Sequence, residues 1–232
     1  MLKRLKGFTL SEILIALSVI GVVSALVLPN LIAGNKAATA KAQFNTAYAL
    51  LTKAFADMDA DNISIKPASY AASQSLYPVL KQYQRVATDC GDFNSEKNDS
   101  VCISYGGKRQ EGDNYKSFNN RAINMNRFDD GAFVINNGML FAIENPANGY
   151  VWVSIDINGK NKLPNRWGWD LFTFELTNDG ILPLGAPGTT AAYSTNPQSL
   201  CSDNGNTNEN GSTCAFFAAT RDDYFSRLYR GH

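Results

Sequence analysis

Residues 1–32 read MLKRLKGFTLSEILIALSVIGVVSALVLPNLI, and this stretch determines how the rest of the chain is interpreted. Between Phe8 and Leu28 the only ionisable side chain is that of Glu12. A helix over these residues is roughly 30 Å long, which is enough to cross the hydrocarbon core of a bilayer. The sequence therefore predicts a membrane-spanning helix that carries one carboxylate.

Three basic residues, Lys3, Arg4 and Lys6, precede the apolar run. A cleaved secretory signal also begins this way, but its apolar run usually has about 7 to 15 residues and ends at an A-x-A-like site. No such site closes this run before Pro29. Because positive charges before a span stay on the cytoplasmic side, we expect a single-pass anchor in the bacterial cytoplasmic membrane with the head outside the cytoplasm.

The start of the apolar run resembles the N-terminal signal of type IV prepilins and type II secretion pseudopilins. The residues that carry this resemblance are Gly7, Phe8, Thr9, Leu10, Ser11, Glu12 and, further on, Pro29. In that family a membrane-embedded aspartyl peptidase cuts after the glycine, here Gly7, and N-methylates the new terminus, here Phe8. The resemblance therefore implies that residues 1–7 are a leader that is removed, while the apolar helix is kept.

An unpaired carboxylate inside a bilayer is unfavourable by roughly a few kcal/mol of free energy, so Glu12 is expected to have a partner. In the family this glutamate is thought to meet the positively charged N-terminus of a neighbouring subunit during assembly. A new α-amino group is a cation with a pKa of about 8, and a low dielectric makes such an ion pair strong. The alternative is that the Glu12 side chain simply reaches the cytoplasmic interface.

The function that the resemblance implies is structural. Prepilin peptidase processes such a subunit, which then polymerises through its N-terminal helix into a type IV pilus filament at the cell surface. Its expected partners are identical or related pilin subunits, the inner-membrane assembly platform and the cytoplasmic membrane. The close alternative is a type II secretion pseudopilin that forms a periplasmic pseudopilus for protein export. An alternative of another class is a membrane-anchored binding protein or enzyme that never polymerises.

Beyond Pro29 the apolar residues recur at alternating spacings of four and three, which predicts an amphipathic helix. These residues are Phe44, Tyr48, Leu51, Phe55 and Met58. Residues 8–61 can then form one helix of about 80 Å. Pro29 lacks an amide donor and should kink this helix, although it could instead end the membrane span.

The remaining sequence predicts an antiparallel sheet. Asn137-Gly138 separates two apolar runs and indicates a hairpin with a type I′ turn. YVWVSIDI follows as a third strand, and LFTFEL and ILPL flank Asn178-Asp179-Gly180 as a fourth and fifth. Short helices are expected within residues 73–84 and 214–232. The fold class is therefore α+β and pilin-like, with the long helix packed on the sheet of the head.

The chain divides into four expected parts. They are the leader at 1–7, the transmembrane and assembly half of the helix at 8–29, its amphipathic half at 30–61, and the globular head at 62–232.

Four cysteines, Cys90, Cys102, Cys201 and Cys214, lie in polar loops of this head. Disulfides are expected outside the cytoplasm, and three pairings are possible. We favour Cys90 with Cys102 and Cys201 with Cys214, because each pair would close a loop. The second pair resembles the C-terminal disulfide loop of many type IV pilins. Zinc is disfavoured because there is no C-x-x-C spacing.

No metal or cofactor is expected, with one possible exception. Asp156, Asn158 and Asp170 offer oxygen ligands around a glycine, and several pseudopilins, which this chain resembles, bind calcium in a loop between strands. The twelve-residue calcium-loop pattern is incomplete because it lacks its final glutamate. The alternative is that Asp156 and Asn158 form an Asx-type turn.

Neither catalysis nor nucleic-acid binding is expected. The chain has one histidine, at position 232, and no nucleophile elbow or phosphate-binding glycine loop. The adjacent acids at 129–130 and 222–223 are expected to be solvated surface. Lysine and arginine together number 21, as do aspartate and glutamate, so there is no basic excess for a nucleic acid.

Overall fold

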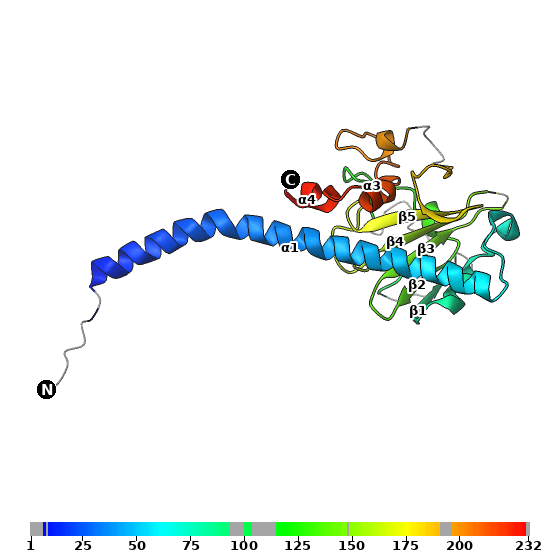
Figure 1. The fold of residues 1–232 in the computed structure, drawn as a ribbon, viewed down its shortest axis with the longest axis horizontal. Coiled ribbons are helices and arrows are strands. Elements are labelled where there is room, and N and C mark those ends of the chain that lie inside the picture. The colour runs from blue at the N-terminus through cyan, green and yellow to red at the C-terminus, as the bar shows by residue number, and fades with distance from the viewer. Residues whose placement is uncertain are drawn as a thin grey trace.

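A computed structural model of the chain describes residues 7, 9–92, 100–103, 115–147, 149–190 and 196–230. One long helix, α1, lies across a six-stranded antiparallel sheet, and its N-terminal half projects away from the head (Figure 1). The predicted α+β, pilin-like arrangement is confirmed. Residues 1–6 and Phe8 of the expected leader and cleavage site lie outside the described residues.

Helix α1 spans Leu10–Ala60, about 75 Å, and runs without interruption through Pro29. The alternative that Pro29 ends the membrane span stays a prediction, because a continuous helix fits both interpretations. Figure 1 shows a bend in the projecting half. Pro29, which lacks a backbone donor, belongs to this half of α1. The packed half buries one face against the sheet, and its buried residues are Ala37, Ala40, Phe44, Ala47, Leu51, Ala54, Phe55 and Met58. Tyr48 of the predicted stripe is only partly buried.

The sheet is a simple meander in which each strand pairs with the next along the chain. Its strands are β1 (Val86–Gly91), β2 (Ala132–Ile135), β3 (Leu140–Glu144), β4 (Trp152–Asp156), β5 (Leu171–Thr177) and β6 (Gly180–Pro183). The four later connections were predicted from their short loops. Strand β1 was not predicted, and it pairs with β2 across an intervening segment of about 40 residues.

The hairpin between β2 and β3 is confirmed, but the predicted turn type is wrong. A type I′ turn needs positive φ at both central residues, and at this turn only Gly138, at φ +88°, has it. The Gly138 amide donates to the Ile135 carbonyl at 2.8 Å, so the loop has three residues and ends in a left-handed glycine. Because this loop has one residue more than the loop of a type I′ hairpin, a single left-handed residue is enough to reverse the chain.

Both faces of the sheet are buried. Alternate residues such as Phe141, Val153 and Phe172 face α1, while Leu140, Ala142 and Leu171 belong to a second apolar cluster. That second cluster includes Tyr115, Phe128 and Trp167 from the loops. The loops therefore cover the face that α1 leaves open, and buried polar groups on that face pair within the sheet, as Ser154 and Thr173 do at 2.8 Å.

Short helices complete the head. They are η1 (Pro67–Tyr70), α2 (Tyr77–Leu80), η2 (Lys81–Tyr83), η3 (Met125–Phe128), η4 (Pro197–Leu200), α3 (Cys214–Thr220) and α4 (Tyr224–Arg230). The helix expected within 73–84 is thus two short pieces, and the C-terminal one is two helices. Helix α4 lies along α1 at the end of the head nearest the projecting half (Figure 1).

Candidate functional site: the exposed half of the long helix

The N-terminus of α1 is closed by a reciprocal pair of hydrogen bonds. Thr9 is the N-cap, and its Oγ1 accepts from the Glu12 amide at 3.3 Å. Glu12 Oε2 in turn accepts from the Thr9 amide at 2.7 Å and from the Thr9 hydroxyl at 2.8 Å. This arrangement is a capping box, and it satisfies backbone donors that a helix leaves free at its start.

Sequence reasoning missed this partner for Glu12, although the signal was present. Residues 9–12 read TLSE, which fits the pattern of Ser or Thr followed three positions later by Glu. The two partners predicted for Glu12 were a neighbour's amino group and the water at the membrane interface. In the single chain, Glu12 has a local partner and stands at the end of the helix where the backbone dipole favours a negative charge.

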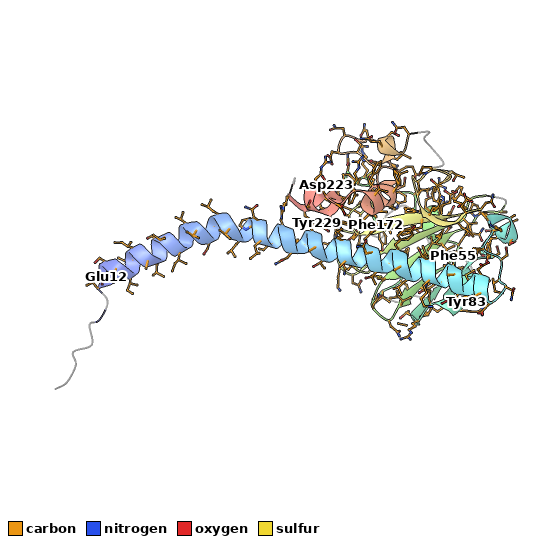
Figure 2. All side chains as sticks on the ribbon, viewed as in Figure 1. Glu12, Phe55, Tyr83, Phe172, Asp223 and Tyr229 are labelled. Atoms are coloured by element: carbon orange, nitrogen blue, oxygen red, sulfur yellow. A yellow bond between two sulfur atoms is a disulfide. The ribbon has the colours of Figure 1, made fainter. Side chains whose placement is uncertain are left out.

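The projecting half of α1 is apolar on all sides. Figure 2 shows its side chains standing free along the helix, with Glu12 at the end far from the head. Every large aliphatic side chain from Leu10 to Ile32 is exposed. It is the one helix within the described ranges that is long and apolar enough to cross a membrane, with a mean hydropathy of 2.4 over its most apolar window. A soluble monomer rarely exposes so large an apolar surface.

The boundary between the projecting and packed halves lies where α4 meets α1. Ala37 is the first buried residue of α1, and Gly34 lies against the Arg230 guanidinium. Lys41 pairs with Asp222 at 3.2 Å, and the Asp222 side chain is fully exposed, as predicted for surface. Pro29, like Glu12, therefore belongs to the half that no part of the described head covers.

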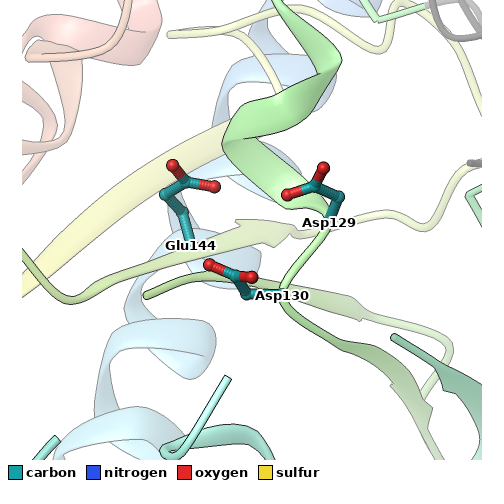
Figure 3. Close-up of side chains that lie close together, drawn as sticks. All are labelled: Asp129, Asp130 and Glu144. Atoms are coloured by element: carbon teal, nitrogen blue, oxygen red, sulfur yellow. The ribbon is translucent and has the colours of Figure 1, made fainter. Parts of the chain in front are cut away.

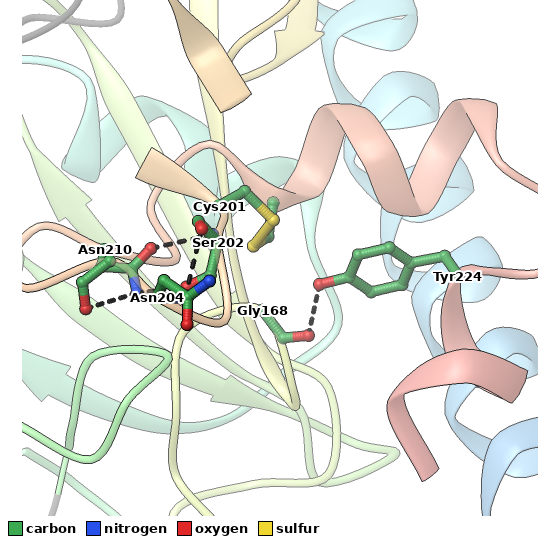
Figure 4. The surroundings of a disulfide bond; sticks show 8 residues. Gly168, Cys201, Ser202, Asn204, Asn210 and Tyr224 are labelled. Carbon is green, nitrogen blue, oxygen red and sulfur yellow. Dashed lines mark hydrogen bonds between the residues drawn. A yellow bond between two sulfur atoms is a disulfide. The ribbon is translucent and has the colours of Figure 1, made fainter. Parts of the chain in front are cut away.

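Two disulfides hold the loops of the head, and they join the two local pairs that the sequence favoured: Cys90–Cys102 and Cys201–Cys214. Figure 4 shows the surroundings of the second bond. Asn210 bridges the loop it closes, because its side chain accepts from the Ser202 amide at 3.1 Å and donates to the Ser202 carbonyl at 2.8 Å. The disulfide thus fixes the start of α3.

The loop suggested for calcium is occupied by hydrogen bonds within the protein. Asp156 Oδ1 accepts from the amides of Asn158 at 3.1 Å and Gly159 at 2.8 Å, which is the Asx-type turn. Asp170 accepts from the amides of Asn165 and Arg166 at 2.8 and 2.6 Å. Burial raises the pKa of both carboxyl groups. Calcium binding at this loop stays a prediction.

The acidic pair at 129–130 departs from its prediction. Asp130 is buried rather than solvated, Asp129 is half-buried, and both lie beside the buried Glu144 (Figure 3). The sequence gives no sign of this cluster, because Glu144 is placed there by the pairing of β3 with β2.

A model of the prokaryotic N-terminal methylation motif matches residues 2–28. No curated protein and no solved structure matches the chain. The matched residues include Gly7, Glu12 and most of the exposed apolar helix. The chain therefore carries the type IV prepilin and pseudopilin signal, and this motif supports a polymerising subunit of the type IV pilin or pseudopilin kind.

Proposed function

We propose that this protein is a structural subunit of a type IV pilus filament. Prepilin peptidase removes residues 1–7 and N-methylates Phe8, and the mature chain polymerises through α1. The observation that carries the proposal is the projecting half of α1, whose aliphatic side chains are exposed on every side while its one carboxylate stands at the very start.

Such a helix needs an apolar environment at every stage. Exposed apolar surface is unfavourable in water by about 25 cal/mol per Å², so the projecting half remains in the bilayer or packs against the same half of other subunits. The α-helix satisfies its own backbone groups and can move between these two environments without breaking hydrogen bonds. The packed half keeps the head attached throughout.

Glu12 supplies the contact that selects a partner. In the described hydrogen bonds of this side chain, Oε2 is the acceptor, and the carboxylate has further acceptor positions through Oε1. The amino group created at Phe8 on another subunit is a cation that can bind there. A desolvated pair of this kind is strong, which favours one stagger between neighbouring helices.

The proposed role is structural and involves no catalysis. The proposed setting is the cytoplasmic membrane before assembly and a surface filament afterwards, with the inner-membrane assembly platform as partner. A type II secretion pseudopilin needs the same helix and the same processing, so the place where filaments are found has to separate the two proposals.

Gly7→Val tests processing and assembly together. The branched side chain should block cleavage, so the protein should keep its leader on an immunoblot and filaments should be absent by electron microscopy. Gly21→Ala is the matched control for processing, because it lies beyond the proposed cleavage site and a Cβ at Gly21 meets nothing within 4 Å. Wild-type filaments recovered by shearing whole cells support the pilus. Filaments confined to the periplasm would support the pseudopilus instead, and normal size with normal filaments in Gly7→Val would exclude both.

A further inference from the structure

Three carboxylates of the head meet between two neighbouring strands. Asp129 and Asp130 follow η3 and lead into β2, and Glu144 is the last residue of β3. One oxygen from each group lies within 4.8 Å of the others. Figure 3 shows the three side chains turned toward a common space. Asp130 and Glu144 are each only 7% exposed.

Among the described residues, Glu144 has donors for only part of its carboxylate. Its Oε2 is buried and accepts no hydrogen bond, while Oε1 lies 3.4 Å from the Tyr150 hydroxyl and 3.8 Å from Arg127. Leaving a buried acceptor unsatisfied costs about 1–3 kcal/mol and more for a charged group. An unsatisfied oxygen on a carboxylate that stands beside two others points to a ligand for this cluster.

Asp130, in contrast, is held firmly in place. Its Oδ2 accepts from the Asn145 amide at 2.7 Å and its Oδ1 from the Ser73 hydroxyl at 3.3 Å. These bonds fix the orientation of the carboxylate, yet they leave lone pairs on both oxygens. Asp129 is half-buried, so solvent reaches the cluster from its side.

A positive side chain also lies beside the cluster. Arg127 lies 3.8 Å from Glu144 Oε1, and it is shared with a fourth carboxylate, because its Nε lies 3.8 Å from Glu209. Carboxylates gathered this closely favour either a proton or a metal cation between them.

We propose that Asp129, Asp130 and Glu144 bind a divalent cation, and that calcium is the ion that fits best. Carboxylate oxygens are the ligands of hard cations, and the cluster offers neither imidazole nor thiolate for zinc or copper. Calcium binds roughly six to eight oxygen ligands in flexible geometry, so water that enters beside Asp129 can complete its coordination shell. Magnesium demands a stricter octahedron and should bind less well.

The cation would join parts of the head that are far apart in sequence. It connects the segment before β2 to the end of β3, next to Asn145. The Asn145 side chain accepts from the Leu76 amide at 3.1 Å and donates to the Tyr70 carbonyl at 2.8 Å, so it holds the segment that follows α1. Filling the site should therefore stabilise the whole head and not only one loop.

Thermal unfolding of the full-length protein in detergent tests the proposal. After treatment with a chelator, calcium chloride at millimolar concentration should raise the Tm of the wild type by about 5 °C or more, and magnesium should have a smaller effect. Glu144→Gln keeps the shape of the side chain but removes its charge, and should abolish this calcium response. Asp129→Asn, at a half-buried position, should weaken calcium binding at least tenfold by titration calorimetry.

Two control variants make the result specific. Glu175→Gln changes another buried glutamate of the same sheet, one that is satisfied by Thr190 and Trp152, and should keep the calcium response. Asp156→Asn should also keep it, because Asp156 belongs to the other loop. The absence of any calcium effect on the wild type, or a response that survives in Glu144→Gln, would overturn the proposal. So would a response lost in Asp156→Asn alone.

Discussion

The carboxylate of Glu12 is already hydrogen-bonded within its own chain. The capping box with Thr9 gives Oε2 two donors before any neighbour is present, at 2.7 and 2.8 Å. The carboxylate also lies at the positive end of α1. A carboxylate that would be unfavourable in a bilayer without a partner is thus stabilised as part of the N-terminus of the helix. In the proposed filament, the amino group of a neighbouring subunit would add a partner to Glu12 rather than replace one.

Glu12→Gln separates these two roles. Glutamine can still accept from the Thr9 amide, so insertion and cleavage after Gly7 should be unchanged. Assembly should fall tenfold or more, because loss of a desolvated ion pair costs about 3 kcal/mol. Filament yield by shearing and processing by immunoblot measure the two steps, with Ser18→Ala as the control in the same helix. Normal filament yield in Glu12→Gln would contradict the proposed contact.

The pKa of Asp89 predicts how the stability of the head changes at acidic pH. Burial alone would raise the pKa of Asp89, but hydrogen bonds from Tyr77, the Gly91 amide and Lys81 outweigh it and lower that pKa to about 2. A folded-state pKa below the unfolded value of about 3.9 stabilises the head above pH 4, and this contribution disappears as the pH falls toward 2.

Asp89→Asn should therefore lower the stability of the head at pH 7 by about 1 kcal/mol, a value reduced for solvent screening because the side chain is one-third exposed. The Tm difference from the wild type should be about 2–4 °C at pH 7 and shrink between pH 4 and pH 2. Thermal melts across this range measure it. A difference that stays constant with pH would show that the charge of Asp89 contributes nothing.

At the scale of the element, the packed half of α1 depends on one aromatic anchor. Phe44 is fully buried, and its ring centroid lies 4.8 Å from Phe172 and 5.8 Å from Phe225. It thus joins the helix to β5 and to α4 at once. Phe172 and Phe55, both labelled in Figure 2, belong to the same buried apolar cluster.

Phe44→Ala should cost about 3–5 kcal/mol of unfolding free energy, because it removes a ring from a site that cannot collapse. The matched control is Thr46→Ala, an exposed position two residues along the same helix, which should change stability by less than about 0.5 kcal/mol. Urea unfolding of the full-length protein in detergent, followed by tryptophan fluorescence, measures both. Equal stability of the two variants would mean that α1 is not held by this contact.

Local patterns in the sequence were sufficient for most elements but not for all. The stripe that includes Phe44 and Leu51 marked α1, and Asn137-Gly138 marked the β2–β3 hairpin, since each signal lies within a few residues. Strand β1 reads VATDCG, a half-exposed edge without apolar alternation, and only its distant partner β2 makes it a strand. The Asp129–Glu144 cluster likewise depends on strand register. The capping box, by contrast, could have been predicted from the sequence TLSE at residues 9–12.

For the whole molecule, the two halves of α1 belong to different environments. All buried residues of α1 lie from Ala37 onward, so the projecting half contributes no buried residue to the core of the head. A chain that starts at Asn30 should therefore be soluble and monomeric by gel filtration, with a Tm within about 3 °C of the full-length protein.

A shorter chain that starts at Asn45 is the control for this truncation. It also loses Ala37, Ala40 and Phe44, and its Tm should fall by at least about 6 °C. Equal melting temperatures for the two truncated chains would contradict the proposed boundary. Aggregation of the longer one would show that the head needs residues before 30.

The place where α1 begins also has a consequence for maturation. Gly7 lies in irregular, exposed backbone two residues before the N-cap Thr9. The proposed cleavage after Gly7 would thus fall outside the first turn of α1. Within the described residues, the cap that starts α1 is formed by Thr9 and Glu12. Both residues stay in the proposed mature chain, so α1 should keep the same start after the leader is removed.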